Sequence, residues 1–291
     1  MSKQTRVGFV GLGNIGKPMA LRLAASDEVE LRVFDVAPEP IAELVTAGAV
    51  AAESVSELGN WADVLCVMVR DDDQVRAVLA EILADLKPRD SFLPVSLVVH
   101  STVAPGTPSD LVAEIMKVCG FAIEVMDAPV SGGSMGAADG SLAIMVGASA
   151  DGFKAVEPVL SLMGSKVIHA GEVGAGTRFK LARNLLHFVS FTAATEAARL
   201  AEAAGLSLMA LGEVVRHTDA ITGGAGAILH RETTAPIEEG DFWHGVFGHV
   251  IALGEKDLTF ATALADELGV DVPLARLALE RLAPGLGIPH D

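Results

Sequence analysis

The chain has 291 residues, of which 51% are hydrophobic and 20% charged, a composition typical of a globular enzyme rather than a disordered chain. Its net charge of −17 disfavours nucleic acid or an anionic membrane surface as the main partner, because like charges repel. No apolar run reaches the length of about 18 residues that a membrane span needs, and the first residues, MSKQTR, lead into a strand-like run without the apolar region of a signal peptide. We therefore expect a cytoplasmic protein.

The first half of the sequence alternates short β-branched runs with helical patterns. This alternation, from residue 6 to about 168, predicts crossover units around a mostly parallel sheet, that is, a doubly wound α/β (Rossmann) domain. The predicted strands are Arg6–Val10, Leu31–Phe34, Val64–Val69, Leu97–His100, Glu124–Asp127, Leu142–Val146 and Lys166–His169. The clearest predicted helices are Pro18–Ala25, Ile41–Ala47, Asp72–Leu86 and Pro108–Cys119.

After Gly176 the pattern becomes almost entirely helical. Phe179–Ala204 is a long Ala/Leu-rich segment that Gly205 is well suited to end, and the last two helical segments are Leu258–Leu268 and Pro273–Leu282. We place a domain boundary at residue 168. The sequence therefore predicts a dinucleotide-binding domain over residues 1–168 and an all-helical domain over residues 169–291, joined by a long helix.

A glycine-rich turn follows the first predicted strand directly. Gly11, Gly13 and Gly16 form G-x-G-x-x-G at the start of a helical pattern. Gly11 allows the tight turn, Gly13 lets the backbone approach a pyrophosphate, and Gly16 allows close packing of helix on strand. The free N–H groups of the helix N-terminus, in the turn that includes Asn14 and Ile15, suit the phosphates of a dinucleotide.

Asp35 ends the second predicted strand, 19 residues after Gly16. A carboxylate at this position accepts hydrogen bonds from the adenine ribose and would repel a 2′-phosphate, so the sequence favours NAD over NADP. A structural role as a turn cap is the plainer alternative for Asp35. A methyltransferase that uses S-adenosylmethionine also has a glycine turn and an acidic ribose ligand, but it would not explain the second half of the chain.

Three further segments carry candidate substrate-site residues. Ser131-Gly132-Gly133 follows a strand end and exposes successive backbone N–H groups, which suit a carboxylate. Lys180 and Asn184 are four residues apart and so share one face at the start of the long helix. Lys256-Asp257 is predicted to begin a later helix.

These motifs resemble those of the β-hydroxyacid dehydrogenase family, which includes 3-hydroxyisobutyrate dehydrogenase, tartronate semialdehyde reductase and, more distantly, 6-phosphogluconate dehydrogenase. The matching stretches come in the family's order and span nearly the whole chain. They are GFVGLGNIGKPMA at the N-terminus, HSTVAPGT at 100–107, DAPVSGGSMGA at 127–137, GAGTRFKLARN at 174–184 and KDL at 256–258. The family's fold, a Rossmann domain followed by an all-α domain, agrees with the pattern of predicted elements.

The resemblance implies roles for individual residues. Lys180 matches the catalytic acid/base of the family, and the substrate would be a small 3-hydroxy acid such as 3-hydroxyisobutyrate, oxidised with NAD. The residues implied in substrate binding are Ser131, Gly132, Gly133, Asn184 and Asp257. Those predicted or implied at the cofactor are Gly11, Gly13, Asn14, Ile15, Gly16, Asp35, Val69, Thr102 and Lys256, with Ser101 also near the nicotinamide. Because Val69-Arg70 and three aspartates replace the Leu-Pro of many relatives, the resemblance assigns no cofactor contact to Arg70 or Gln74.

We expect no metal site. Asp71-Asp72-Asp73 precede a helical pattern and indicate a helix N-terminus, while His244 and His249 lack the spacing of four that places two ligands on one helix face. His100, beside the presumed nicotinamide site, is expected to be structural. Cys66 and Cys119 lie in apolar stretches far apart, which favours buried free thiols over a disulfide.

Two other functions remain open from the sequence. One is an imine or β-keto-acid reductase on the same scaffold, in which a change of the lysine would be common; the other is a dinucleotide-binding sensor that has lost catalysis. The presence of Lys180 disfavours both. The apolar segment Leu274–Leu286 has few charges to cover a solvent-facing side, so we expect a homodimer or homotetramer.

Overall fold

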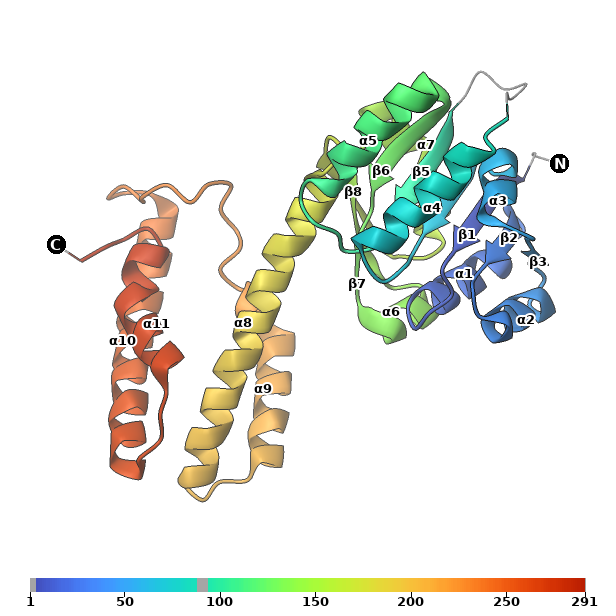
Figure 1. Ribbon diagram of the computed structural model, residues 1–291. Helices are drawn as coiled ribbons and strands as arrows, with labels where there is room; N and C mark the ends of the chain where they lie inside the picture. Colours follow the sequence, from blue (N-terminus) through green and yellow to red (C-terminus); the bar gives the residue numbers. More distant parts are fainter. Residues whose placement is uncertain (1–3, 88–93, 291) are drawn as a thin grey trace. The chain divides into compact units, whose positions relative to one another are not determined.

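The computed structural model describes residues 4–87 and 94–290. The chain forms two compact units, Met1–Arg183 and Asn184–Asp291, of which the first is an α/β domain and the second is helical (Figure 1). The predicted boundary after residue 168 stays a prediction. The division by packing falls later, because the first turns of helix α8 (Ala175–Ala203) lie against the sheet of the first unit.

The described part of the first unit contains one nine-stranded sheet, ordered β3-β2-β1-β4-β5-β6-β8-β7, with β9 paired to β8. Its strands are β1 (Thr5–Val10), β2 (Val29–Phe34), β3 (Val50–Ala51), β4 (Val64–Val67), β5 (Val95–Val99), β6 (Ile123–Asp127), β7 (Val130–Ser131), β8 (Ala143–Gly147) and β9 (Lys166–Gly171). Pairing is parallel from β3 through β6, while β8 runs antiparallel to β6 and β7. The predicted doubly wound, mostly parallel sheet is confirmed.

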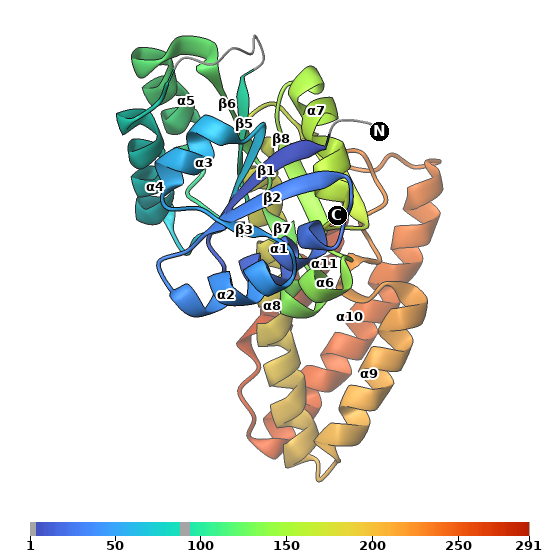
Figure 2. The same cartoon turned by 90° about the vertical axis from the view of Figure 1, so that its right-hand side faces the viewer.

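Helices cover both faces of this sheet (Figures 1 and 2). They are α1 (Gly16–Ala24), α2 (Pro38–Thr46), α3 (Val55–Trp61), α4 (Asp72–Ala84), α5 (Thr107–Val118), α6 (Gly133–Asp139) and α7 (Ala150–Ser161), with a 3₁₀ turn at Gly120–Ala122. The four clearest helices predicted from the sequence are present. Asp71 caps α4 by accepting a hydrogen bond from the Gln74 N–H at 3.0 Å, as expected for the aspartate run.

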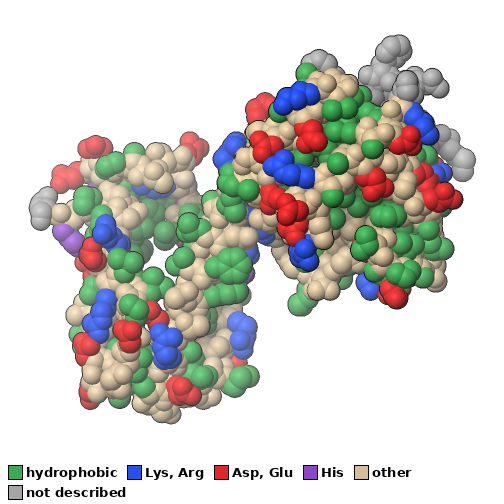
Figure 3. All heavy atoms as spheres, viewed as in Figure 1, with side chains coloured by type: hydrophobic (Ala, Val, Ile, Leu, Met, Phe, Trp, Pro, Cys, Tyr) green, Lys and Arg blue, Asp and Glu red, His purple; other side chains and the backbone are tan. Residues whose placement is uncertain are grey.

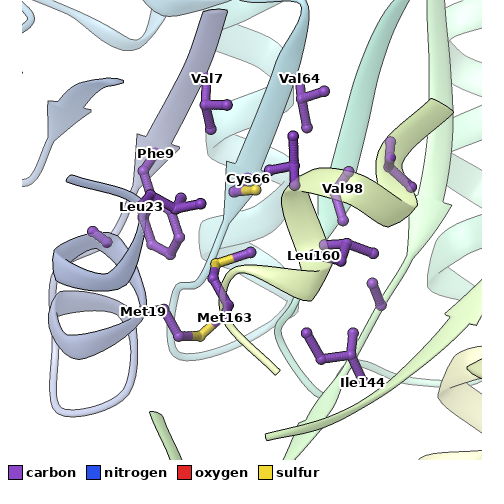
Figure 4. Packing of buried hydrophobic residues seen from close by; sticks show 14 of the residues in the cluster. Val7, Phe9, Met19, Leu23, Val64, Cys66, Val98, Ile144, Leu160 and Met163 are labelled. Carbon is purple, nitrogen blue, oxygen red and sulfur yellow. The ribbon is translucent and has the colours of Figure 1, made fainter. Parts of the chain in front are cut away.

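Alternation along the strands places the apolar side chains in two cores. Phe9, Cys66 and Val98 point to one face, where they meet α1, α2 and α7 (Figure 4), and Val10, Leu65 and Leu97 point to the other, where they meet α3, α4 and α5. Side chains of consecutive strand residues face opposite ways, so a strand buried on both faces is apolar throughout. Both cysteines are free thiols, as predicted; Cys66 is buried, which raises its pKa to about 12, but Cys119 is only half-buried.

The helical unit contains the rest of α8 with α9 (Leu208–Thr222), α10 (Phe242–Leu268) and α11 (Pro273–Gly285), and a 3₁₀ turn at Gly224–Gly226. Gly205 follows the end of α8 in the left-handed conformation (φ +73°), as its sequence position predicts. No helix among the described residues is long and apolar enough to span a bilayer.

One predicted helix start is wrong. Lys256-Asp257 does not begin a helix but lies deep inside α10, which starts at Phe242. Asp241 caps α10 by accepting a hydrogen bond from the Trp243 N–H at 2.7 Å. The glycines within residues 245–254 lower helix propensity without ending the helix, because packing of Phe247 and Ile251 against α11 outweighs that cost.

Candidate active site

The surroundings of the three glycines in the turn after β1 fit the roles that their spacing predicts, and the contact of Gly13 with a pyrophosphate stays a prediction. Gly11 is in a left-handed conformation (φ +94°), and a Cβ there would collide with the Met68 carbonyl oxygen. A Cβ on Gly16 would collide with the Gly11 carbonyl oxygen, so α1 can only start this close to the turn without a side chain. A Cβ on Gly13 would meet nothing within 4 Å, which leaves its surroundings open to a ligand.

Asn14 and Ile15 complete this turn. Asn14 is exposed, while Ile15 is half-buried and packs against the core beneath α1. The helical hydrogen bonds begin here, with the Lys17 N–H donating to the Gly13 carbonyl oxygen at 3.0 Å. The turn therefore presents a helix N-terminus at the carboxyl end of β1, between β2 and β4, where the strand order reverses.

A cavity of about 370 Å³ lies beside the turn at the carboxyl ends of β1, β2 and β4. Its wall includes the predicted cofactor residues Gly11, Gly13, Asp35 and Val69. The remaining lining residues are Val10, Phe34, Val36, Val55, Met68, Arg70, Gln74, Ala77, Val78 and Glu81. The open space at Gly13 and this cavity beside a helix N-terminus fit a dinucleotide.

Arg70 and Gln74 line this cavity, although the sequence assigned them no contact with a cofactor. The Gln74 side-chain oxygen accepts a hydrogen bond from the Arg70 N–H at 2.9 Å, and the Arg70 guanidinium pairs with Asp71 at 2.8 Å. The signal that could have revealed them is their position: they follow β4, whose carboxyl end adjoins that of β1 in a parallel sheet.

Asp35 is held in the cavity wall by the backbone. One carboxylate oxygen accepts a hydrogen bond from the Leu12 N–H at 2.5 Å and the other from the Ala37 N–H at 2.8 Å. The first bond ties the end of β2 to the glycine turn. The side chain therefore caps the turn, one of the two roles considered for it from the sequence, and places a negative charge beside the cavity; its contact with a ribose stays a prediction.

Ser101 is buried between the ends of β4 and β5. Its hydroxyl donates to the Val69 carbonyl oxygen at 2.7 Å and accepts from the Val69 N–H at 3.0 Å. Thr102, by contrast, is exposed next to it. Ser101 thus fixes the backbone of a cavity residue, and Thr102 is the member of the pair left accessible for contact with a ligand.

His100 is fully buried at the end of β5. Its Nδ1 lies 2.9 Å from the Ala128 carbonyl oxygen, and its ring stacks with Phe9. Nε2 has no partner among the residues that the structure describes. Burial lowers the pKa of His100 to about 4, so the ring is neutral at neutral pH and ties β5 to the loop after β6. This supports the structural role expected from the sequence.

Asp127 precedes that loop and was assigned no role from the sequence. Its buried carboxylate accepts hydrogen bonds from the Gly174 N–H at 2.5 Å and from the Thr177 N–H at 2.6 Å. The start of α8 is thereby joined to the end of β6. The sequence signal was the position of Asp127 at the head of the DAPVSGG stretch.

The Ser-Gly-Gly segment has a backbone that favours glycine. Gly132 and Gly133 both have positive φ, at +135° and +65°, where side chains are strained. Ser131 precedes them in β7 and its hydroxyl oxygen faces Lys180. The segment therefore places Ser131, which Gly132 and Gly133 follow directly, in contact with the candidate catalytic lysine.

Lys180 is buried in the second turn of α8. Its Nζ donates to the Val130 carbonyl oxygen at 2.5 Å and to the Ser131 hydroxyl at 2.8 Å. Burial, and secondarily the charge of Arg183, lowers the pKa of Lys180 to about 8. At this pKa the amine changes protonation state close to neutral pH, as a general acid/base requires.

The remaining predicted residues, Asn184, Lys256 and Asp257, belong to the helical unit. Lys256 and Asp257 are exposed on α10 and form an ion pair of 3.1 Å with each other. Their implied roles in binding stay predictions. Among the residues described, no group of three or more His, Cys, Asp or Glu side chains is arranged to hold a metal ion.

A parallel sheet with a glycine turn at its switch point and a cavity beside it defines a dinucleotide-binding Rossmann protein. Comparison with family profiles extends this class over nearly the whole chain. Residues 6–171 match the NAD binding domain of 6-phosphogluconate dehydrogenase, and residues 174–285 match the profile described as NAD-binding of NADP-dependent 3-hydroxyisobutyrate dehydrogenase.

Individual relatives agree with these profiles. An uncharacterised oxidoreductase of Mycobacterium tuberculosis is 52% identical over 98% of this chain and 94% of its own length. The 3-hydroxyisobutyrate dehydrogenase of Pseudomonas aeruginosa is 34% identical over 94% of this chain and 90% of its own. The crystal structure of an oxidoreductase from Mycobacterium avium, 46% identical, superimposes with a TM-score of 0.92 over 99% of this chain and 100% of its own. The chain belongs to the 3-hydroxyisobutyrate dehydrogenase (β-hydroxyacid dehydrogenase) family of NAD(P)-binding oxidoreductases.

Proposed function

We propose that this protein is an NAD-dependent dehydrogenase that oxidises a small 3-hydroxy acid, with Lys180 as general acid/base. The observation that carries the proposal is the state of Lys180: a buried amine, hydrogen-bonded through Nζ to strand β7, with a pKa lowered to about 8. A lysine that only paired with surface charges would be exposed and would keep its ordinary pKa of about 10.4.

The contacts of Nζ suggest how the amine would work. A neutral amine has two N–H bonds and one lone pair. The Val130 carbonyl oxygen and the Ser131 hydroxyl can take the two N–H bonds, which leaves the lone pair to accept the proton of a substrate hydroxyl. When bound, NAD(P) would supply the acceptor for the hydride that leaves the carbinol carbon of the substrate. In the reverse direction, protonated Lys180 would return its proton from Nζ to the carbonyl oxygen.

Ser131 contacts this amine, and the segment that it begins, Ser131, Gly132 and Gly133, is our candidate for binding the substrate carboxylate. The backbone N–H groups of a turn with positive φ can converge on an anion. Asn184 follows Lys180 by one helical turn, and we propose that it and Asp257 complete the substrate site, as the family resemblance implies.

Relatives whose names include a substrate narrow the class of hydroxy acid that we propose for this protein. Besides the 3-hydroxyisobutyrate dehydrogenase, these include the 2-(hydroxymethyl)glutarate dehydrogenase of Eubacterium barkeri, 30% identical, and the NAD-dependent L-serine dehydrogenase of Pseudomonas aeruginosa, 33% identical. All three named acids carry a CH₂OH group on the carbon next to the carboxylate. We therefore propose a 2-substituted 3-hydroxypropanoate, a primary alcohol, as the substrate.

The substrate class is tested by absorbance at 340 nm with NAD and NADP and a panel of acids. The panel contains 3-hydroxyisobutyrate, L-serine and 2-(hydroxymethyl)glutarate, with the secondary alcohol 3-hydroxybutyrate as the matched control. We expect at least one primary alcohol to exceed 3-hydroxybutyrate in kcat/KM by about tenfold or more. Turnover of the secondary alcohol alone, or of none of the four, would contradict the proposed class.

The role of Lys180 is tested by two substitutions. Lys180→Ala should lower kcat at least about a hundredfold, the usual loss when general acid/base catalysis is removed. Lys180→Arg should be nearly as slow, because a guanidinium keeps the charge but does not release its proton near neutral pH. Dinucleotide affinity should change little in either variant. If Lys180→Arg keeps most of the wild-type kcat and only raises KM, the lysine is an anion-binding residue and the mechanism is wrong.

We also propose that the protein is a homodimer or homotetramer. Large apolar side chains on α9 and α10, among them Met209, Ile221, Phe242 and Phe260, are largely exposed, and the space-filling view shows hydrophobic surface on the helical unit (Figure 3). A second subunit would cover such a surface. Light scattering at micromolar concentration should give a multiple of the 30.0 kDa chain mass, and a monomer would contradict the proposal.

A further inference from the structure

The start of α8, the helix that carries Lys180, is hydrogen-bonded to the sheet through a buried carboxylate. Asp127 ends β6, and its two oxygens accept hydrogen bonds from two N–H groups at the start of the helix, those of Gly174 at 2.5 Å and Thr177 at 2.6 Å. The first N–H groups of a helix have no partner within the helix. Asp127 supplies that partner, and its negative charge also suits the positive end of the helix dipole.

Two glycines allow the helix to come this close. A Cβ on Gly147 of β8 would collide with the Asp127 carboxylate and would lie 2.9 Å from the N atoms of Ala175 and Gly176. A Cβ on Gly176 would collide with the Met145 carbonyl oxygen and lie 2.6 Å from that of Asp127. The helix end therefore lies directly on the backbone of β6 and β8, with no room for a side chain between them.

Lys180 makes a second connection between α8 and the sheet, through its side chain. It follows Thr177 by one helical turn, and its Nζ bonds to the Val130 carbonyl oxygen, three residues after Asp127. The helix and the Asp127–Ser131 segment are thus joined at two points: the Asp127 carboxylate accepts from the helix backbone, and the Lys180 amine donates to β7. The structure describes no ion pair between the two side chains, so Asp127 acts on Lys180 through the backbone that it holds.

We infer that Asp127 is a positioning residue, which sets the depth and direction of the Lys180 amine by holding the N-terminal turn of α8 against β6. The inference rests on the proposed role of Lys180. Without the carboxylate, the buried N–H groups of Gly174 and Thr177 would lack acceptors, and the turn would move to find them. Nζ would then lose its hydrogen bonds to Val130 and Ser131 and become more exposed to solvent. Because burial is the main cause of its lowered pKa, that pKa should rise.

The experiment follows the ionisation of Lys180 directly. Lysines are labelled with ¹³C at Cε, the Lys180 signal is assigned by its loss in Lys180→Arg, and its pH titration is compared in wild type and Asp127→Asn. Asparagine offers one acceptor oxygen in place of two. We expect a titration midpoint near 8 in wild type and a rise of about one unit or more in Asp127→Asn. In oxidation, kcat at neutral pH should fall by about tenfold to a hundredfold.

Glu124→Gln is the matched control. Glu124 lies in the same strand, β6, and its carboxylate holds a different helix by accepting from the hydroxyl of Ser149, the capping residue of α7, at 2.9 Å. Its replacement should lower the free energy of unfolding without moving the Lys180 titration or kcat. If Asp127→Asn and Glu124→Gln shift the Lys180 titration midpoint equally, both carboxylates contribute only general stability, and the inference is overturned.

A second variant covers the case in which Asp127→Asn does not fold. Asp127→Ser keeps one uncharged acceptor oxygen in a smaller side chain, so it weakens the hydrogen bonds to Gly174 and Thr177 without adding bulk. It should raise the Lys180 pKa in the same direction. If either folded variant titrates at the wild-type pH, Asp127 does not position the amine. The test of positioning is separate from the test of catalysis. If the Lys180 titration shifts but Lys180→Arg remains active, the catalytic role of Lys180 is refuted and the positioning role of Asp127 stands.

Discussion

The two units of this protein differ in how completely each buries its own apolar side chains. In the first unit, alternate residues of the central strands fill two cores, one on each face of the sheet. In the described part of the helical unit, the fully buried cluster is small: Ile237, Phe247, Ile251, Ala283 and Leu286. Large apolar side chains of α9 and α10 are left exposed instead.

The two units also differ in how their polar side chains are held. In the first unit the candidate site residues are buried and held by hydrogen bonds: Lys180 to β7, Ser101 to Val69 and Asp127 to the start of α8. In the helical unit, Lys256 and Asp257 are exposed and paired only with each other. The chemistry that we propose therefore depends on groups positioned by the packed sheet domain, where a substitution should cost most.

The largest effect is expected at His100, the buried neutral histidine of the sheet domain. Its pKa is about 4 in the folded protein and about 6.5 in an unfolded chain, so the unfolded state alone takes up a proton between these pH values. Stability should be unaffected above pH 6.5 and should fall as the pH drops from 6.5 to 4, by about 3 kcal/mol in all.

Urea unfolding at a series of pH values measures this loss. His100→Asn, whose amide can still reach the Ala128 carbonyl oxygen, should lose less stability on acidification than wild type. His169→Asn is the control, because His169 is exposed and also bonds to a backbone carbonyl oxygen, that of Ala148 at 2.8 Å. If wild type and His100→Asn lose stability in parallel, His100 is not the group responsible.

Substitutions of Gly16 and Gly13, two glycines of the same turn, should distinguish a loss of packing from a loss of dinucleotide binding. Gly16→Ala forces a Cβ against the Gly11 carbonyl oxygen and should destabilise the sheet domain by about 1–3 kcal/mol. Gly13→Ala meets no protein atom within 4 Å and should change stability by less than about 0.5 kcal/mol while weakening dinucleotide binding. Thermal unfolding and a fluorescence titration with NADH distinguish the two, and equal stability losses would refute the assigned division of roles.

The choice of cofactor should depend on Asp35, whose carboxylate is fixed in the cavity wall. We expect NAD to exceed NADP in kcat/KM by at least about tenfold, a difference of roughly 1.4 kcal/mol. Asp35→Asn should reduce this preference by removing the charge that repels a 2′-phosphate. Equal use of the two cofactors by the wild-type enzyme would show that Asp35 only caps the glycine turn.

The smallest effect on stability is expected in the helical unit. Lys256→Ala breaks an exposed ion pair with Asp257 and should change the free energy of unfolding by less than about 0.5 kcal/mol. If Lys256 contacts the cofactor, as the family resemblance implies, KM for the dinucleotide should nevertheless rise. A large loss of stability in Lys256→Ala would contradict the difference that we describe, in which exposed polar groups of the helical unit contribute little to stability.

The sequence by itself determined the fold class and most of the candidate cofactor site. Strand and helix periodicities are local, and so is the glycine turn, because a positive φ at Gly11 and a missing side chain at Gly16 are needed by the turn itself. Lys180 was found through its neighbours in the GAGTRFKLARN stretch. The start of α10 was missed, because the packing of Phe247 and Ile251 sustains a helix through glycines that locally oppose it.

Only the tertiary structure decided what surrounds each of these residues. Asp127 and Thr177 are 50 residues apart in sequence, and no local pattern shows that one accepts the hydrogen bond of the other. Arg70 and Gln74 reach the cavity because β4 lies next to β1, a pairing of distant segments. The lowered pKa of Lys180 likewise comes from burial, which depends on everything packed around the amine and not on its neighbours in the chain.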